Sequence, residues 1–211
     1  MKTNEQLELL QPQLHSTFRT LKGSNEIDFL SVWHILTSPG CNVSDVPDHL
    51  IGLHLGAPVT ITHWRDGLER HHRFRRGDVV FAPAGSPVCY AHAEPVDALY
   101  INISPNAVDE VAVQLGIDLG KTHLANNWGT SDPNLARMGR EVLAEIGSPG
   151  LGSRLLLETM STQIIIHLLR HYTVPSPTHL DYSEDHDVPA LQARLQPVID
   201  YMMYPINRTV K

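Results

Sequence analysis

The spacing of apolar residues divides the chain into a strand-like region and a helix-like region. From Ile27 to Ser104, short runs rich in β-branched and aromatic residues alternate with clusters of Pro, Gly, Asn and Asp. This texture is typical of strands joined by tight turns. Short, evenly spaced strands of this kind indicate an antiparallel sandwich or barrel. The predicted strands are Asp28–Leu36, His49–Leu55, Val59–Trp64, Glu69–Phe74, Asp78–Ala82, Val88–His92 and Ala98–Ile103.

After Ser104 the apolar period changes to that of an α-helix. Ser104 and Asp132 are each followed by proline, which is the usual pairing of an N-cap with a first helical residue. The spacing predicts helices from these two points to about Gly116 and Gly147, where glycine ends each pattern. A third and longer helix, SRLLLETMSTQIIIHLLRHY, is predicted from Ser153.

The two ends of the chain have other textures. Residues 1–26 are polar with scattered leucines and are interpreted as an N-terminal arm. Residues 174–189 are rich in Pro, Ser, Thr, Asp and His, which predicts a linker between domains. In residues 190–211 apolar positions again follow a helical period, although Pro197 interrupts the pattern.

Composition and charge narrow the classes of function. The formal net charge is −7, whereas a protein that grips DNA must neutralise several phosphates, so these residues alone are not expected to bind DNA well. No apolar run approaches the length of a membrane span, and no secretory signal is recognisable, which predicts a cytoplasmic protein. Cys41 and Cys89 are far apart in sequence and are expected to be free thiols.

The order of these features resembles the AraC/XylS family of transcription regulators. The resemblance covers roughly residues 27–211 and rests on GDVVFAPAG in the strand region, HLLRHY at the end of the long helix, and LQPVIDYMMYPINRTV after the linker. It implies a mainly β fold with added helices: a cupin-like antiparallel β-barrel of the jelly-roll type over 27–104 and a helical dimerisation segment over 105–173. It further implies a small-molecule effector. The residues themselves predict no cofactor.

The same resemblance concerns DNA. The segment 190–211 would begin a helix-turn-helix (HTH) domain that contacts operator DNA, and the HTH readers themselves would follow Lys211. We therefore expect either a chain cut before that domain or a naturally short gene product. Effector binding would shift the population of dimer states and so change how two DNA-binding halves are presented.

The barrel is expected to hold the effector among aromatic and polar side chains. Strand parity predicts five lumen residues, and His54 and Tyr100 are further candidates. Simple filling of the core by Trp64 and Phe74 is the alternative for those two rings. The five nominated residues are Trp64, His72, Phe74, Tyr90 and His92.

A cupin-class metal enzyme, an oxygenase or isomerase, is the alternative function. The candidate ligands His63, His71, His72 and His92 depart from the pattern of metal-binding cupins, because His71 and His72 are adjacent and must point to opposite faces of a strand. Val88 also stands where a further ligand would fall, so no metal is expected. A stand-alone module that pairs with a full-length regulator is a third possibility.

The long helix carries more apolar residues than one narrow stripe requires, which predicts a homodimer. The alternative is a helix enclosed between the barrel and its neighbouring helices. The residues expected to remain exposed in a monomer and to form the interface are Leu157, Met160, Ile164 and Leu168.

Overall fold

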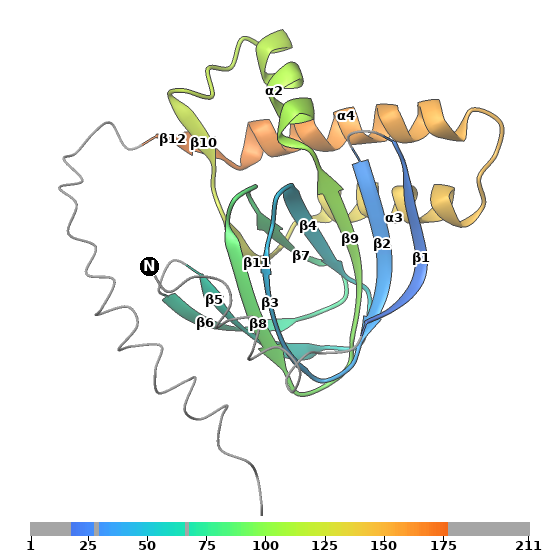
Figure 1. Cartoon of the computed structure of the whole chain (residues 1–211), viewed down its shortest axis with the longest axis vertical. Coiled ribbons are helices and arrows are strands. Elements are labelled where there is room, and N and C mark those ends of the chain that lie inside the picture. Colours follow the sequence, from blue (N-terminus) through green and yellow to red (C-terminus); the bar gives the residue numbers. More distant parts are fainter. Residues whose placement is uncertain (1–17, 28–29, 66–67, 177–211) are drawn as a thin grey trace, which may run out of the picture. The chain divides into compact units, whose positions relative to one another are not determined.

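The computed structural model describes residues 18–27, 30–65 and 68–176, which form two large antiparallel sheets, one small sheet and three helices (Figure 1). The strand order is β1-β2-β9-β4-β7-β11 in the six-stranded sheet and β3-β8-β5-β6 in the four-stranded sheet, while β10 pairs with β12. The strands are β1 Phe18–Ile27, β2 Leu30–Thr37, β3 Gly40–Asp45, β4 His49–His54, β5 Val59–Arg65, β6 Leu68–Phe74, β7 Asp78–Ala82, β8 Pro87–His92, β9 Val96–Ile103, β10 Thr122–Leu124, β11 Asn127–Ser131 and β12 Thr173–Pro175.

The predicted strands are confirmed, with small shifts at their ends, as β2 and β4 to β9. The sequence pattern missed β1, β3 and the three short strands β10, β11 and β12, in which polar residues and glycine weaken the alternation. Part of the predicted arm is therefore a strand, because β1 pairs along β2. Residues 1–17 lie outside the described part of the chain.

The six-stranded sheet buries side chains on both of its faces. On β9, Leu99 and Ile101 belong to the large core that the helices complete, whereas Ala98 belongs to a smaller core with Ile61 and Phe74 of the four-stranded sheet. This alternation follows from the two-residue period of a strand. The described region thus has three layers: the four-stranded sheet, the six-stranded sheet and the helices.

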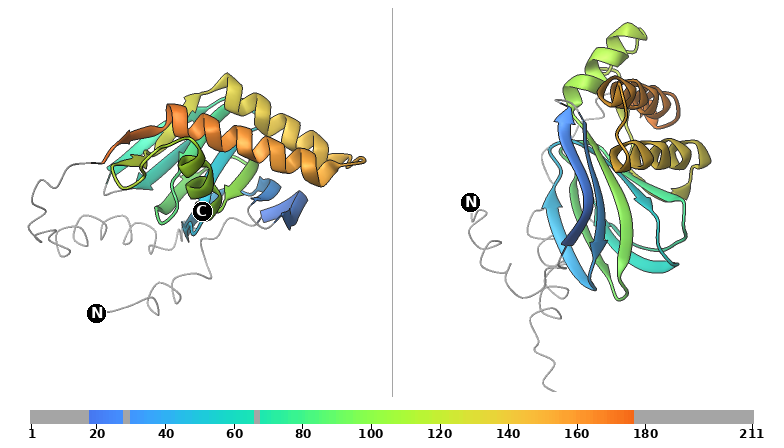
Figure 2. Two further views of the ribbon diagram at one scale, coloured as in Figure 1. Left: turned by 90° about the horizontal axis from the view of Figure 1, so that it is seen from above. Right: turned by 90° about the vertical axis from the view of Figure 1, so that its right-hand side faces the viewer.

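The helices begin where the sequence predicts. Helix α2 (Pro105–Gln114) is capped by Ser104, whose side chain accepts from the Ala107 N–H, and α3 (Pro133–Gly147) is capped by Asp132, which accepts from the Leu135 N–H. Helix α4 (Ser153–His171) lies beside α3, and the pair covers one face of the six-stranded sheet (Figure 2). The expected cupin-like barrel followed by a helical segment is confirmed as the fold.

The long helix is enclosed rather than exposed along its apolar length. Leu157, Ile164 and Leu168 are only 6%, 0% and 0% exposed and lie in the large core, and Met160 packs against it. The prediction that these side chains remain exposed in a monomer is wrong, because the outer face of the six-stranded sheet is itself apolar and needs α4 as its cover. The exposed leucines of this helix are Leu155 and Leu156.

The structure tests the remaining sequence predictions only in part. The compact unit ends at Ser176, and the predicted linker beyond it and the HTH start over 190–211 lie outside the described residues. Cys41 and Cys89 are free thiols on the neighbouring strands β3 and β8. Among the described helices, none combines the length and apolar character of a membrane span.

Candidate functional site

Two hollows are candidate sites: a small cavity inside the barrel, here called the lumen, and a larger cleft outside it, here called the outer cleft. The lumen lies between the two large sheets and has a volume of about 40 Å³. At about 10–15 Å³ per water, it has room for roughly three water-sized groups. It is lined by Leu50, Gly52, His54, Ile61, His63, Phe74, Val80, Val88, Tyr90, Val96, Ala98 and Tyr100.

Two buried histidines present hydrogen-bond acceptors in the barrel. The His54 Nε2 lies 2.7 Å from the Ala57 carbonyl, and the His92 Nδ1 lies 2.8 Å from the Glu94 carbonyl. Because a carbonyl only accepts, each of these nitrogens carries the proton and donates it. The other nitrogens, His54 Nδ1 and His92 Nε2, are buried acceptors with no hydrogen-bond partner among the described residues.

Burial reinforces the neutral form of one of these rings. His92 is 6% exposed, and desolvation lowers its pKa from 6.5 even though the Glu94 carbonyl and carboxylate favour the protonated form. At neutral pH, His92 therefore keeps its acceptor lone pair.

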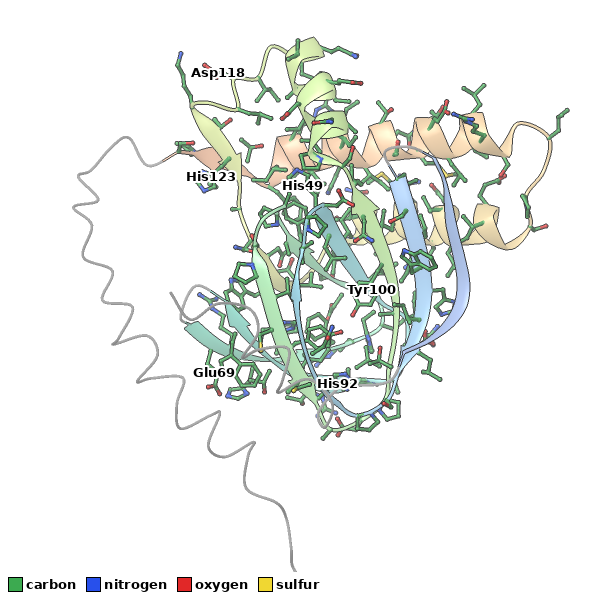
Figure 3. All side chains as sticks on the ribbon, in the orientation of Figure 1. His49, Glu69, His92, Tyr100, Asp118 and His123 are labelled. Atoms are coloured by element: carbon green, nitrogen blue, oxygen red, sulfur yellow. The ribbon has the colours of Figure 1, made fainter. Side chains whose placement is uncertain are left out.

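The tyrosines of the lumen form a polar link across it. The Tyr90 hydroxyl accepts from Asn42 Nδ2 at 3.3 Å and is also hydrogen-bonded to Tyr100. Burial raises the pKa of Tyr90, so its hydroxyl remains protonated and can donate as well as accept. Figure 3 shows Tyr100 between the two sheets and His92 toward the end of the barrel that is remote from α4.

The structure places the five predicted lumen residues in different surroundings. Phe74 and Tyr90 line the lumen, and so do the two further candidates, His54 and Tyr100. The His92 ring stacks against Tyr90 at 5.9 Å beside the lining. His72 faces inward as Phe74 does, but lies in the outer cleft.

Trp64 lies outside the lumen. Its indole Nε1 donates to Glu69 Oε2 at 2.9 Å on the exposed side of the β5–β6 pair. The register explains the difference, because Ile61 pairs with His72 whereas Trp64 pairs with Glu69. Residues paired across antiparallel strands share a face, so Trp64 and His72 lie on opposite faces.

His63 occupies the position that parity assigned to its neighbour. It is 4% exposed, lines the lumen, and lies with its ring centroid 5.7 Å from that of Phe74. The pairing of β5 with β6 was the signal that could have placed it, since the hairpin fixes which residues face inward.

The candidate metal ligands His63, His71, His72 and His92 lie on β5, β6 and β8. The prediction that His71 and His72 point to opposite faces is confirmed: His71 contacts Thr62 and Glu69 on the exposed face, whereas His72 packs against Phe74. Within residues 18–27, 30–65 and 68–176, no three His, Cys, Asp or Glu side chains gather in a way that could hold a metal ion.

The outer cleft has a volume of about 720 Å³ and is open to solvent. Its walls are β6, β11, the start of α3 and the end of α4. Trp128 and Gly129 of β11 separate it from the lumen, because Trp128 contacts the His63 ring and Gly129 lies against Phe74. Sequence reasoning missed this cleft, because it depends on β11 crossing back over β6.

A hydrogen-bonded group at the base of the outer cleft joins three elements. Asp132 Oδ2 accepts from His167 Nε2 at 2.7 Å and from the Tyr172 hydroxyl at 3.0 Å, while Asn127 Nδ2 donates to that hydroxyl at 3.2 Å. Burial alone would raise the pKa of Asp132. The donors Leu135 N–H, His167 and Tyr172 outweigh it and lower the pKa below 3.8, so Asp132 is ionised at neutral pH.

Comparisons with known proteins bear on the fold. No family model matches the chain, and no curated protein matches it. Among solved structures, the AraC-like transcriptional activator CuxR is similar, with 16% identity and a TM-score of 0.50 over 74% of this chain and 56% of that chain. At this identity the likeness shows the fold alone: a cupin-like barrel with helices.

Two further solved structures have lower TM-scores. The EutQ protein of Clostridium difficile has 17% identity and a TM-score of 0.37 over 49% of this chain and 81% of that one. Oxalate decarboxylase from Bacillus subtilis has 14% identity and a TM-score of 0.33 over 49% of this chain and 35% of that one. The chain thus spans about half of the activator and about a third of the decarboxylase.

Proposed function

We propose that this chain is the effector-sensing and dimer-forming part of an AraC-type transcription regulator. The observation that carries the proposal is the pair of buried acceptors, His54 Nδ1 and His92 Nε2, left without partners inside a barrel of this fold. A buried polar group without a partner costs free energy, so its retention favours a bound donor. The order of features along the sequence resembles that of AraC/XylS regulators, and this resemblance supports the regulatory role.

The proposed effector carries O–H or N–H donors and enters the lumen. An imidazole nitrogen with an open lone pair accepts hydrogen bonds from donors such as alcohols and amides. The tyrosine hydroxyls of Tyr90 and Tyr100 supply further hydrogen bonds. Because the lumen holds only about three water-sized groups, a larger effector would place its donor-bearing end there or displace a ring.

The regulatory consequence follows from linkage. An effector that binds one arrangement of the chain more tightly shifts the population toward that arrangement. In the proposed protein, two copies pair in the cytoplasm, and a DNA-binding domain outside the described residues contacts the operator. No direct contact of residues 18–176 with DNA is required.

The experiment is a thermal-unfolding screen with neutral alcohols, polyols and primary amides. The expected result is that at least one compound raises the Tm of the wild type and of His123→Leu, a control at an exposed histidine. His54→Leu should reduce the affinity by about threefold to tenfold, as expected for the loss of one neutral hydrogen bond.

Tyr100→Phe, which removes only a hydroxyl, provides a second test should His54→Leu fold poorly. Compounds whose binding is equally tight in both lumen variants and in the wild type would place the effector elsewhere. A screen without any stabilising compound would count against a donor-binding lumen.

A further inference from the structure

The outer cleft has the size of a ligand site and is separate from the lumen. Its volume of about 720 Å³ falls within the roughly 300–1,000 Å³ that is usual for small-molecule sites. The two hollows share a wall at Trp128 and Phe74, yet their linings differ. The lumen is mostly apolar and its polar lining is histidine and tyrosine, whereas the outer cleft contains charged and amide side chains.

Arg70 is the charged group that distinguishes the outer cleft. Its guanidinium lies over the Trp128 ring, with 5.0 Å from Cζ to the ring centroid. Arginine remains charged at any physiological pH, and stacking on an aromatic ring leaves its in-plane N–H groups able to bind carboxylate or phosphate oxygens in pairs. This stacking fixes the position of the guanidinium before a ligand binds.

The carboxylates near Arg70 are engaged with other partners. Glu69 contacts His71 and Trp64, and Asp78 accepts from the Arg75 N–H and lies 3.6 Å from His72. Asp132 accepts from three donors at the base of the outer cleft. Among the described residues, Arg70 therefore has no acidic partner within ion-pair distance.

Other groups of the outer cleft favour an anion with hydroxyl or similar polar substituents. His171 is exposed on the last turn of α4, and Asn134 and Ser131 flank the start of α3, where the positive end of the helix dipole lies. These side chains can hydrogen-bond the polar remainder of a ligand whose negative end lies at Arg70. Asp132 keeps its negative charge, which its three donors stabilise, so the negative end of the ligand is assigned to Arg70 and not to the base of the outer cleft.

We propose that the outer cleft binds a small organic anion, with its carboxylate or phosphate oxygens on the Arg70 guanidinium. The site is distinct from the donor-binding lumen of the proposed function. It gives the chain a second ligand-binding site, which lies next to the hydrogen-bonded group that joins α3 to the end of α4.

The test follows the indole N–H resonance of Trp128, which is assigned by its loss in Trp128→Phe. Citrate and benzoate test carboxylates, glycerol 3-phosphate tests phosphate esters, and glycerol and benzamide serve as neutral counterparts. Saturable shifts are expected with at least one organic anion, and Arg70→Gln should weaken them. Any shifts caused by glycerol or benzamide, which belong to the compound classes proposed for the lumen, should be the same in the wild type and in Arg70→Gln. The chemical class that saturates identifies carboxylate or phosphate.

Arg70→Gln should weaken that binding by about tenfold or more, the effect expected for loss of a charge-assisted pair. Arg73→Gln is the matched control, because it removes the same charge from the same strand at an exposed residue that does not line the outer cleft. Arg70→Lys keeps the charge without the planar fork and should fall between the two.

Three outcomes would overturn the proposal. They are no saturable shift with any of the anions, equal weakening by Arg70→Gln and Arg73→Gln, or shifts with inorganic phosphate as large as those with the organic anions, which indicate an adventitious ion only. None of them touches the lumen, whose test uses neutral compounds and His54→Leu. The two proposals can therefore fail separately.

Discussion

At the residue scale, Gly129 determines how closely β11 approaches β6. Its φ is +118°, and a Cβ there would lie 2.7 Å from Phe74 Cζ and 2.8 Å from His72 Cδ2. Gly129→Ala should therefore lower the free energy of unfolding by about 2 kcal/mol or more, from backbone strain and overpacking together. Urea unfolding measures the change. Gly150→Ala, where no atom lies within 4 Å of the new Cβ, is the control, and equal effects of the two would contradict the close approach.

Single residues were also where sequence reasoning was least accurate. Phe74, Tyr90, His54 and Tyr100 could be predicted as lining because alternation in each strand limits the choice to two faces. The choice between those faces failed at Trp64, because strand parity without the register of the hairpin assigned its indole to the lumen. The register puts His63 inward and leaves the Trp64 indole on Glu69, and that register is a property of the hairpin rather than of either residue.

At the element scale, capping signals could be read from the sequence because they are local. Ser104-Pro105 and Asp132-Pro133 each bring together an acceptor side chain and a preset φ within two residues. The strands β3 and β11 were missed, because their pairing partners, β8 and β7, supply the reason for their extended form. The outer cleft was invisible for the same reason, as it lies between elements that only the fold brings together.

Asp132 links α3 to α4, and its titration should be visible in the free energy of unfolding. Its carboxylate joins the start of α3 to α4 through His167 and to the end of α4 through Tyr172. Because its folded pKa is below 3.8, the stabilisation is present above the ordinary carboxyl pKa and is lost as the pH falls through the lowered value. Asp132→Asn keeps an N-cap residue while removing the charge.

We expect Asp132→Asn to lose about 1–3 kcal/mol at neutral pH, the usual range for hydrogen bonds to a charged group. The difference from the wild type should shrink as the pH is lowered past 3.8. Urea unfolding across that range measures it, with Glu110→Gln at an exposed site of α2 as the control. A difference that stays constant with pH would show that the charge of Asp132 has no part in the stability.

At the scale of the whole molecule, the three layers explain why α4 carries more apolar residues than one narrow buried stripe requires. An amphipathic stripe on a surface helix predicts one buried face, but this helix packs against the six-stranded sheet and lies between α2 and α3, so most of its apolar residues are internal. The sequence shows how much apolar surface a helix has. It does not show whether the same chain or a second copy covers it.

The interface of the proposed homodimer must then use apolar side chains at the start of α4 that the rest of the chain leaves exposed. Leu155 and Leu156 are 67% and 43% exposed, and the preceding turn carries the fully exposed Leu151. The turn between α3 and α4 projects past the edge of the sheet (Figures 1 and 2), where a second copy has access to these side chains. Exposed apolar side chains that lie close together are typical of an interface, and burial of this set is the reason we expect two copies to associate.

A dimer held by this surface makes the Tm rise with protein concentration, because association stabilises only the folded chain. The double variant Leu155→Lys, Leu156→Lys places like charges from both copies at the interface, so sedimentation velocity should find monomers and the Tm should no longer depend on concentration. Val113→Lys, at a 77% exposed site on α2, should leave the dimer intact. Monomeric wild type at every concentration, or equal dissociation by the α2 variant, would remove α4 from the interface.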